Sequence, residues 1–224
     1  MKKSHHFPKA LALIIVSALL PVFSTSCTTG LAPKPNPKQT ASIKGVHVNP
    51  YTQGSYAHFT ASSKYPKTYS IYRNEALLSA TDGSNAKVIV DRGLQRGILL
   101  NNGQVAMDYP VSTGNKNFPT PAGKYEVLKK KKAEKRSNLY GKIYDADGTV
   151  VNSNADSSKD TIPEGGRFEG ALMSSWMRIS WDGIGMHRGK VPRYPASHGC
   201  IRTYYKAVDT VYDKVAIGTP VVVR

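Results

Sequence analysis

Two stretches of the sequence each combine apolar runs with a residue pair that favours a tight hairpin turn. In residues 97–109, Asn102-Gly103 separates two apolar runs. In residues 177–187, Asp182-Gly183 follows a run that alternates strictly between apolar and polar side chains. Asn-Gly and Asp-Gly favour the positive φ angles of two-residue turns, and alternation is typical of a half-buried strand. The sequence therefore predicts two hairpins and a mainly β domain.

Three further strands and one helix complete the predicted elements. The helix has four apolar residues at the spacing of one helical face, with Thr203 as a plausible N-cap and Gly218 as a plausible stop. These apolar residues are Val208, Val211, Tyr212 and Val215. The strands are expected at 87–91, 124–128 and 220–224.

The first 26 residues have the organisation of a secretory signal peptide. Lys2, Lys3 and Lys9 form a positive start, and an apolar run over residues 10–22 follows. The run is too short, and too soon followed by polar residues, for a comfortable membrane span. We therefore expect residues 1–26 to direct export to the periplasm or cell envelope.

Cys27 follows this segment directly and resembles the lipidated cysteine of bacterial lipoproteins. Small residues fill the two places before it, although Ser24 stands where such a site usually has Leu. The alternative is ordinary cleavage after a small residue, with Cys27 incidental. Residues 27–45 are rich in Pro and Lys and have no apolar periodicity, so they would form a semi-rigid tether. The tether favours lipidation and membrane attachment through Cys27.

The chain is strongly basic, which indicates an anionic partner. Lys and Arg number 31 against 15 Asp and Glu, a net charge of +16. Nucleic acid, a membrane surface and an acidic wall polymer all fit such an excess. Export argues against nucleic acid and leaves an anionic wall or membrane surface. The densest block, residues 129–132 with Lys135 and Arg136, is either a solvated strand end or loop, or a contact with that surface.

Cys200 is a candidate nucleophile. The sequence has only two cysteines, so lipidation of Cys27 would leave Cys200 without a disulfide partner. A buried, inert thiol is the alternative. The neighbours favour chemistry, because His198 is adjacent and His187 ends a predicted strand, and an imidazole can take the thiol proton. Gly199 lets backbone approach a substrate, and the start of the predicted helix would favour a thiolate.

The segment from Ser197 to Arg202, with His187 upstream, resembles the catalytic signature of the YkuD-type L,D-transpeptidases. The likeness extends over residues 87–224. Similar segments lie at 88–91, 110–114, 119–125, 137–141 and 181–187. Two features depart from the family pattern: the spacer from His187 to Ser197 is short, and Arg202 stands where some members have Asn.

The resemblance implies a mainly β, β-sandwich-like catalytic domain over residues 87–224, with a short helix after the catalytic cysteine. It leaves residues 46–86 as a Tyr-rich N-terminal extension without an assigned role. Cys200 would be the nucleophile that forms a thioester. His187 would be the general base and acid, oriented by a nearby backbone carbonyl, that of Arg188 or Gly189.

The other site residues follow from the same resemblance. Ser197, His198 and Gly199 would shape the site, with the N–H groups of Gly199 and Cys200 as an oxyanion hole; His198 could instead be structural. The expected substrate contacts are Arg202, Tyr140 and Trp181. Arg202 could equally pin the helix start, and Tyr140, Trp176 and Trp181 could simply be core or cleft wall.

The implied reaction is the formation of peptidoglycan cross-links. The partner would be a tetrapeptide stem, whose terminal D-residue leaves as Cys200 forms a thioester, before a neighbouring amine takes the acyl group. With water as acceptor, the protein would be an L,D-carboxypeptidase or endopeptidase. A catalytically inert wall-binding lipoprotein is the alternative from another class. No cofactor or metal is implied, because ligands at regular spacing are lacking in the sequence.

Overall fold

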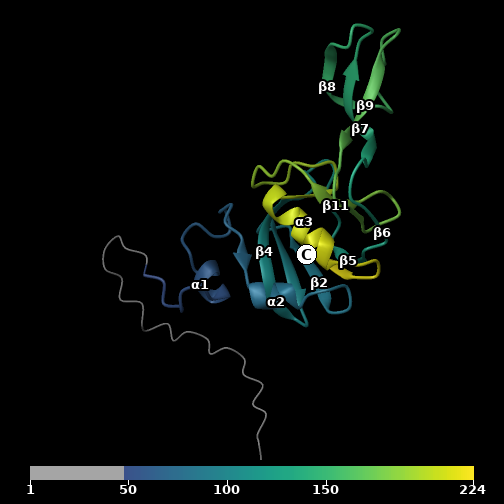
Figure 1. Ribbon diagram of the computed structural model, residues 1–224. Helices are drawn as coiled ribbons and strands as arrows, with labels where there is room; N and C mark the ends of the chain where they lie inside the picture. Colours follow the sequence, from purple (N-terminus) through teal and green to yellow (C-terminus); the bar gives the residue numbers. More distant parts are fainter. Residues whose placement is uncertain (1–47) are drawn as a thin grey trace, which may run out of the picture. The chain divides into compact units, whose positions relative to one another are not determined.

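The computed structural model describes residues 48–224, so the predicted signal peptide, the tether and Cys27 lie outside the described residues. This part of the chain is mainly β, as predicted, with three helices and thirteen strands (Figure 1). None of its helices has the length and apolar character needed to cross a membrane.

The elements follow one another along the chain as Figure 1 labels them. The helices are α1 (Tyr56–Thr60), α2 (Glu75–Ser79) and α3 (Tyr205–Lys214). The strands are β1 (Tyr72–Arg73), β2 (Ala86–Asp91), β3 (Arg96–Asn101), β4 (Gln104–Ser112), β5 (Gly123–Glu126), β6 (Lys129–Lys131), β7 (Arg136–Tyr144), β8 (Val150–Asp156), β9 (Arg167–Leu172), β10 (Trp176–Arg178), β11 (Gly185–Arg188), β12 (Ile201–Thr203) and β13 (Pro220–Val223).

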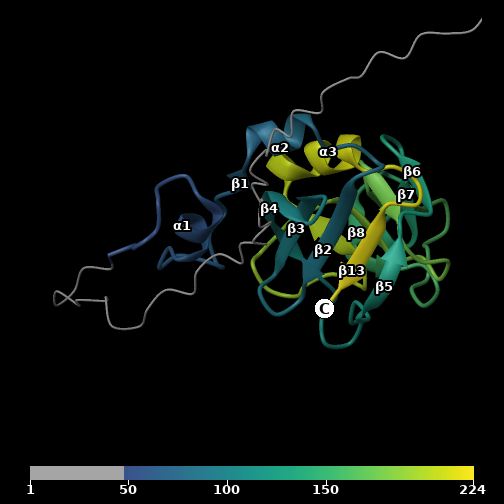
Figure 2. The same ribbon diagram turned by 90° about the horizontal axis from the view of Figure 1, so that it is seen from below.

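The main sheet has ten strands and curls until its two edges meet. Its order is β5-β13-β2-β3-β4-β12-β11-β10-β6, with β1 paired to β4; Figure 2 shows β4, β3, β2, β13 and β5 side by side. The edge strands β5 and β6 are consecutive in the chain. Between them, the Val127 N–H donates to the Thr219 carbonyl at 3.0 Å and the Leu128 N–H to the Arg178 carbonyl at 2.8 Å. These two residues join the opposite edges of the sheet.

Both predicted hairpins are confirmed. Strands β3 and β4 pair antiparallel around Asn102 and Gly103, which have φ angles of 45° and 84°. Strands β10 and β11 pair antiparallel around Gly183, whose φ is 107°. The predicted strands at 87–91, 124–128 and 220–224 are present as β2, β5 and β13, although β5 ends two residues earlier.

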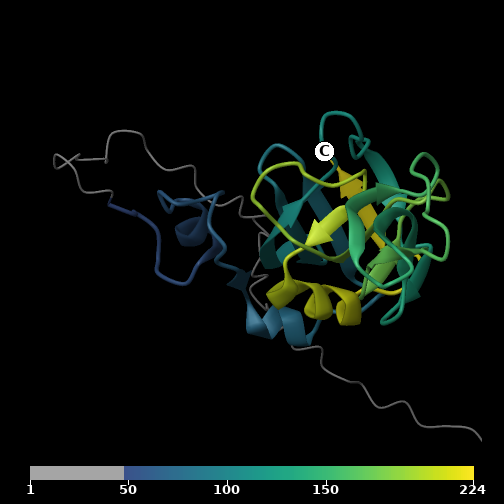
Figure 3. The ribbon, with the colours of Figure 1, turned by 90° about the horizontal axis from the view of Figure 1, so that it is seen from above.

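Helix α3 buries the predicted face but begins and ends differently. Val208 and Val211 are fully buried in the core. Thr203 is not the N-cap, because residues 201–203 form β12 between β4 and β11, and Tyr204 takes that position. The helix ends at Lys214, and Gly218 instead lies in the turn before β13 with φ of 86°. Helices α2 and α3 lie side by side in Figure 3.

The lysine run at residues 129–132 is not simply a solvated strand end, because Lys130 is partly buried. Residues 129–131 form the edge strand β6. The ammonium of Lys130 donates to the carbonyl of Tyr212 at 2.7 Å, and also to that of Val215, at the C-terminal end of α3. A cation at this end satisfies carbonyls that have no partner within the helix and interacts favourably with the helix dipole. Lys130 is therefore a structural cation.

A separate three-stranded sheet rises from the main one, where Figure 1 shows β8, β7 and β9 together. The sequence did not predict this sheet, whose last strand in the chain, β9, begins at Arg167. Gly141 and Gly170 let its strands approach, because a Cβ at either position would lie within about 2 Å of a backbone oxygen on the opposite strand. The sheet contributes Tyr140 to the candidate site.

The Tyr-rich segment is tied to the domain by a buried ion pair. Nε of Arg96 lies 2.6 Å from Oδ1 of Asp108, and both side chains are fully buried. The hydroxyls of Tyr56 and Tyr65 donate to Oδ2 of Asp108 at 2.9 and 3.1 Å. Burial, with the Asp108 carboxylate, raises the pKa of Tyr65 to about 12, so this hydroxyl remains protonated as a donor.

The guanidinium of Arg96 also holds the segment's main chain. Its Nη1 donates to the carbonyl of Thr68 at 2.9 Å and its Nη2 to that of Ser70 at 3.1 Å. Two residues later, β1 pairs antiparallel with β4. Within the described residues, the Tyr-rich segment is thus bound to the sheet through the buried Arg96–Asp108 pair and through the pairing of β1 with β4.

We predict that Asp108→Asn destabilises the protein by about 3–5 kcal/mol, because it leaves the buried Arg96 charge without its counter-ion. Urea unfolding followed by circular dichroism measures the change. Glu75→Gln, which breaks the exposed pair with Arg73, is the control and should change stability little. Equal effects of the two substitutions would contradict a central role for the buried pair.

Candidate active site

The parallel pairing of β11 with β12 brings the two candidate catalytic residues together. His187 is in register with Arg202. Paired residues of neighbouring strands point to the same face, and residues two apart along a strand share a face. Cys200, two residues before Arg202, is therefore placed on the face of His187. Both side chains line one small cavity of about 100 Å³.

His187 is buried and held in one orientation. Its Nδ1 lies 2.7 Å from the carbonyl oxygen of Arg188, one of the two carbonyls expected for this role. A carbonyl only accepts, so Nδ1 carries the proton and Nε2 is the free base. The ring also packs against Trp176, with 5.9 Å between centroids. Burial, aided by the Arg202 charge and opposed by the hydrogen bond to the Arg188 carbonyl, lowers the pKa of His187 to about 4, so the imidazole is neutral at pH 7.

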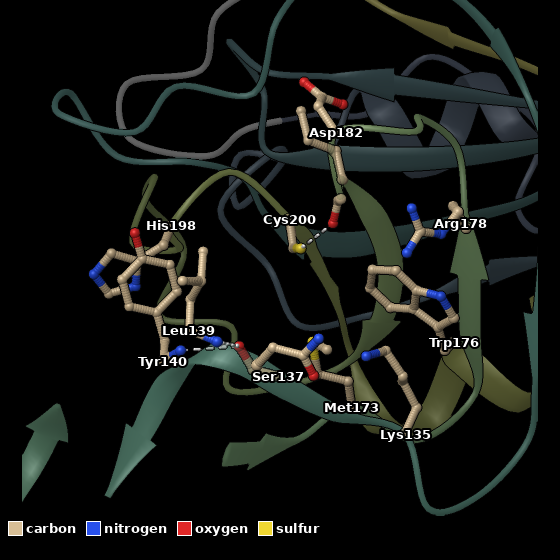
Figure 4. Close-up of a pocket in the computed structure, with 13 residues that line it drawn as sticks. Lys135, Ser137, Leu139, Tyr140, Met173, Trp176, Arg178, Asp182, His198 and Cys200 are labelled. Carbon is tan, nitrogen blue, oxygen red and sulfur yellow. Dashed lines mark hydrogen bonds between the residues drawn. The ribbon is translucent and has the colours of Figure 1, made fainter. Parts of the chain in front are cut away.

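Cys200 is partly exposed, and its sulfur points into the space between Tyr140 and Trp176 in Figure 4. Its Sγ lies 3.7 Å from the Gly183 carbonyl oxygen. Burial raises the pKa of the thiol, against the opposing effects of the Gly185 N–H and nearby cations, of which Arg202 acts most strongly. The expectation that a helix start would favour the thiolate is wrong, because β12, not a helix, follows Cys200.

The loop before Cys200 is fixed by hydrogen bonds to three of its carbonyls. The Asn115 N–H donates to the Ser197 carbonyl at 2.9 Å. The hydroxyl of Thr120 donates to the Gly199 carbonyl at 2.7 Å, and the buried hydroxyl of Ser197 donates to the Cys200 carbonyl. Ser197 and Gly199 therefore shape the site, Gly199 with φ of 103°, an angle that favours glycine.

Thr120 is a positioning residue to which the sequence assigned no role. It is buried, and its hydroxyl accepts from the Gly114 N–H at 2.8 Å while it donates to the Gly199 carbonyl. Because a trans peptide is planar, fixing this carbonyl directs the Cys200 N–H the opposite way. Thr120 lies in residues 119–125, one of the segments that resemble the family. This resemblance is the one feature of the sequence that could have indicated a role for Thr120.

His198 and Tyr140 form a stacked wall beside the sulfur (Figure 4). Their ring centroids are 3.9 Å apart and the planes are 14° from parallel. Phe118 packs on the His198 ring at 4.9 Å. No hydrogen bond of the His198 ring is formed within residues 48–224, so His198 contacts the site as a stacked ring rather than as a structural hydrogen bonder.

Arg202 and Trp181 differ in their relation to the site. Arg202 lines the small cavity beside Cys200, and its guanidinium has no hydrogen-bond or ion-pair partner among the described residues. It does not pin the start of α3, which begins three residues later. Trp181 is 77% exposed and lines none of the site's cavities, whereas Trp176 is buried and forms part of the cleft wall.

Two larger cavities flank the stacked pair. One of about 340 Å³ reaches Cys200 and is lined by Lys135 and Arg178 together with Asp182. The other, of about 410 Å³, lies along β7 and β9 and is lined by Arg202 and Glu169 among others. Tyr140 and His198 border both. Each cavity is lined by side chains of both signs of charge.

The site combines the neutral His187 imidazole, which has a free Nε2, with the Cys200 thiol in the same cavity. The N–H groups of Gly199 and Cys200 donate no hydrogen bond among the described residues. These are the parts of a cysteine-dependent acyl-transfer site. The chain belongs to the YkuD family: the model of the L,D-transpeptidase catalytic domain matches residues 85–223. Members of this family are cysteine-dependent enzymes that act on the peptide stems of peptidoglycan. No curated protein sequence matches the chain.

Solved structures of L,D-transpeptidases resemble the chain at low identity. One from Mycobacterium smegmatis is 21% identical, with a TM-score of 0.47, 62% of this chain covered and 58% of that one. One from Xylanimonas cellulosilytica is 22% identical, with a TM-score of 0.47, and the match covers 64% of this chain and 61% of that one. One from Enterococcus faecium is 26% identical, with a TM-score of 0.44, and the match covers 62% of this chain and 50% of that one. The chain thus spans between half and about three fifths of the length of these solved chains.

We predict that the His187 imidazole titrates near pH 4, well below the value of about 6.5 for an exposed histidine. Nitrogen-15 NMR of the histidine rings measures the midpoint. Arg202→Gln should raise it, because the Arg202 charge disfavours the imidazolium. Arg224→Gln, at the C-terminus, is the control and should leave it unchanged. A midpoint at 6.5 or above would mean that the ring is not buried as described.

Proposed function

We propose that this protein is an L,D-transpeptidase that forms peptidoglycan cross-links through a Cys200 thioester. The observation that carries the proposal is the shared cavity of a partly exposed thiol and a buried, neutral imidazole with Nδ1 bound to a carbonyl. The donor is a tetrapeptide stem, attacked at the carbonyl of its third residue. The family match supports this substrate class.

In the first half-reaction, Nε2 of His187 takes the thiol proton as Sγ of Cys200 attacks the carbonyl carbon. The oxyanion is received by the N–H groups of Gly199 and Cys200, which donate no hydrogen bond within residues 48–224. The carbon–nitrogen bond to the terminal D-residue breaks, and the imidazolium gives its proton to the leaving amine. The product is a thioester on Cys200.

In the second half-reaction, an amine of a neighbouring stem attacks the thioester carbon. His187 removes a proton from this amine, the carbon–sulfur bond breaks, and the sulfur recovers a proton. The two large cavities support transfer to an amine, because one is lined by Cys200 and the other by Arg202, while Tyr140 and His198 border both. Donor and acceptor then have separate approaches.

The test is the incubation of purified protein with tetrapeptide muropeptides, followed by chromatography and mass spectrometry. We expect cross-linked dimers with the wild type and at least a thousandfold less with Cys200→Ala, because loss of a nucleophile removes the covalent route. A carbapenem should add its mass to the wild type and not to Cys200→Ala. The two proteins should unfold at similar urea concentrations.

Other outcomes decide among the alternatives. Shortened monomers without dimers would mean that water is the acceptor and that the protein is a carboxypeptidase or endopeptidase. Unchanged wall-linked function in Cys200→Ala, with no carbapenem adduct on the wild type, would favour an inert wall-binding lipoprotein.

We further propose that the protein is exported and anchored through lipidated Cys27, which the signal-like residues 1–26 and the Pro/Lys-rich tether support. Its basic charge suits an anionic wall or membrane surface. Mass spectrometry of the mature N-terminus should show lipid on Cys27, and Cys27→Ser should move the protein from the membrane fraction to the soluble one. An unmodified mature N-terminus would exclude the anchor and leave the enzymatic proposal standing.

A further inference from the structure

The carboxylate of Asp209 contacts side chains from three separate segments of the chain, one of which is the strand that carries His187. Its Oδ2 accepts from Nη2 of Arg188, the last residue of β11, at 2.6 Å. Its Oδ1 accepts from the hydroxyl of Ser175, just before β10, at 2.6 Å. The ammonium of Lys132, just after β6, lies 3.3 Å from the same Oδ1. One carboxylate on α3 thus connects three separate parts of the sheet.

Two of these contacts bear directly on His187. Arg188 is the residue whose carbonyl accepts the Nδ1–H of the catalytic ring. Its N–H donates to the Ser174 carbonyl at 2.9 Å, so the end of β11 is bound to the chain that leads into Ser175. Asp209 therefore holds the side chain of Arg188 while the main chain of Arg188 holds the imidazole.

Ser175 fixes the opposite wall of the imidazole. It is buried and has φ of 54°, an angle that a residue with a Cβ adopts only when its surroundings enforce it. Its N–H donates to the Lys132 carbonyl at 2.7 Å, and its hydroxyl donates to Asp209. The next residue is Trp176, whose ring packs on His187. Asp209 thus supports both the acceptor of the ring N–H and the surface on which the ring rests.

The carboxylate itself is remote from the reacting atoms. Its side chain is 44% exposed and lines none of the cavities at the site. The hydrogen bond from Ser175, followed by the Lys132 and Arg188 charges, lowers the pKa of Asp209, so it is ionised at neutral pH. Half-exposed ion pairs contribute little to stability. Such a residue can be removed without unfolding the domain, which makes its role testable.

We propose that Asp209 is a positioning residue for the catalytic imidazole, acting through Arg188 and Ser175. The inference rests on the proposed function insofar as His187 is the base. Without Asp209, the Arg188 carbonyl and the Trp176 ring lose a common anchor, and Nε2 samples orientations that do not reach the thiol. Small displacements of a catalytic group reduce the rate steeply.

Asp213 provides a matched control. It lies one turn further along α3 and pairs with the same Lys132 at 3.2 Å. It has no hydrogen bond with Arg188 or Ser175 in the described part of the chain. Asp213→Asn therefore removes an acid from the same helix and the same lysine while it leaves the support of His187 intact.

The experiment compares Asp209→Ala, Asp209→Asn and Asp213→Asn with the wild type. We expect Asp209→Ala to lower the rate of carbapenem acylation and the kcat of cross-linking by about tenfold to a hundredfold, with KM little changed. Asp209→Asn, which keeps one acceptor oxygen, should lie between Asp209→Ala and the wild type. Asp213→Asn should stay within about twofold of the wild type, since exposed charges contribute little.

A structural readout separates this proposal from the proposed function. In the wild type, the Nδ1–H proton of His187 should give a low-field NMR signal and exchange slowly with solvent. In Asp209→Ala this signal should be lost, or the proton should exchange with solvent faster. This outcome supports positioning even if the wild type proves to form no cross-links. If the signal and the acylation rate in Asp209→Ala match those of Asp213→Asn, Asp209 does not position His187. Should Asp209→Ala fail to fold, Arg188→Gln removes the same ion pair and takes its place in the comparison.

Discussion

The parallel pairing of β11 with β12 decides where the thiol and the imidazole lie. Parallel neighbours cannot be joined by a tight turn, so after β11 the chain must cross back to the end of the sheet where β11 begins before it can enter β12. Here residues 189–200 make that return without a helix. The loop that carries Cys200 therefore depends on contacts with other parts of the fold for its shape, and its position relative to His187 is a tertiary property.

Those contacts come from the connection between β4 and β5. The Thr113 carbonyl accepts from two N–H groups of the returning loop, and Thr120 bonds the Gly199 carbonyl. Strand β4 also pairs with β12, immediately after Cys200. Strand β4 is in turn the strand whose Asp108 receives Arg96 and the tyrosines of the N-terminal segment. One strand thus supports the catalytic loop at one end and the buried ion pair near its middle.

The sequence predicted what local chemistry dictates. Asn102-Gly103 and Asp182-Gly183 determine hairpins by themselves, and the apolar face of α3 is visible in its spacing. The start of α3 was misplaced because residues 201–203 have partners on two strands distant in sequence, which override a local capping signal. Trp181, named as a substrate contact for its place beside a motif, is exposed and lines none of the site's cavities, since adjacency to a motif does not determine side-chain direction. The roles of Lys130 and Asp209 arise from contacts that only the folded chain creates.

The electrostatics of the site favour a neutral resting pair rather than a preformed thiolate and imidazolium. Burial raises the pKa of Cys200 and lowers that of His187 to about 4, and Arg202 disfavours the imidazolium while it favours the thiolate. Because the thiolate is the form that oxidants attack, a protonated sulfur is less easily oxidised. In the proposed mechanism the proton then moves to Nε2 as the sulfur attacks, so the rate would depend on the orientation of the ring. A site of this kind needs a rigidly held imidazole more than it needs a low thiol pKa. The contacts of Asp209 with Arg188 and Ser175 matter to its chemistry for this reason.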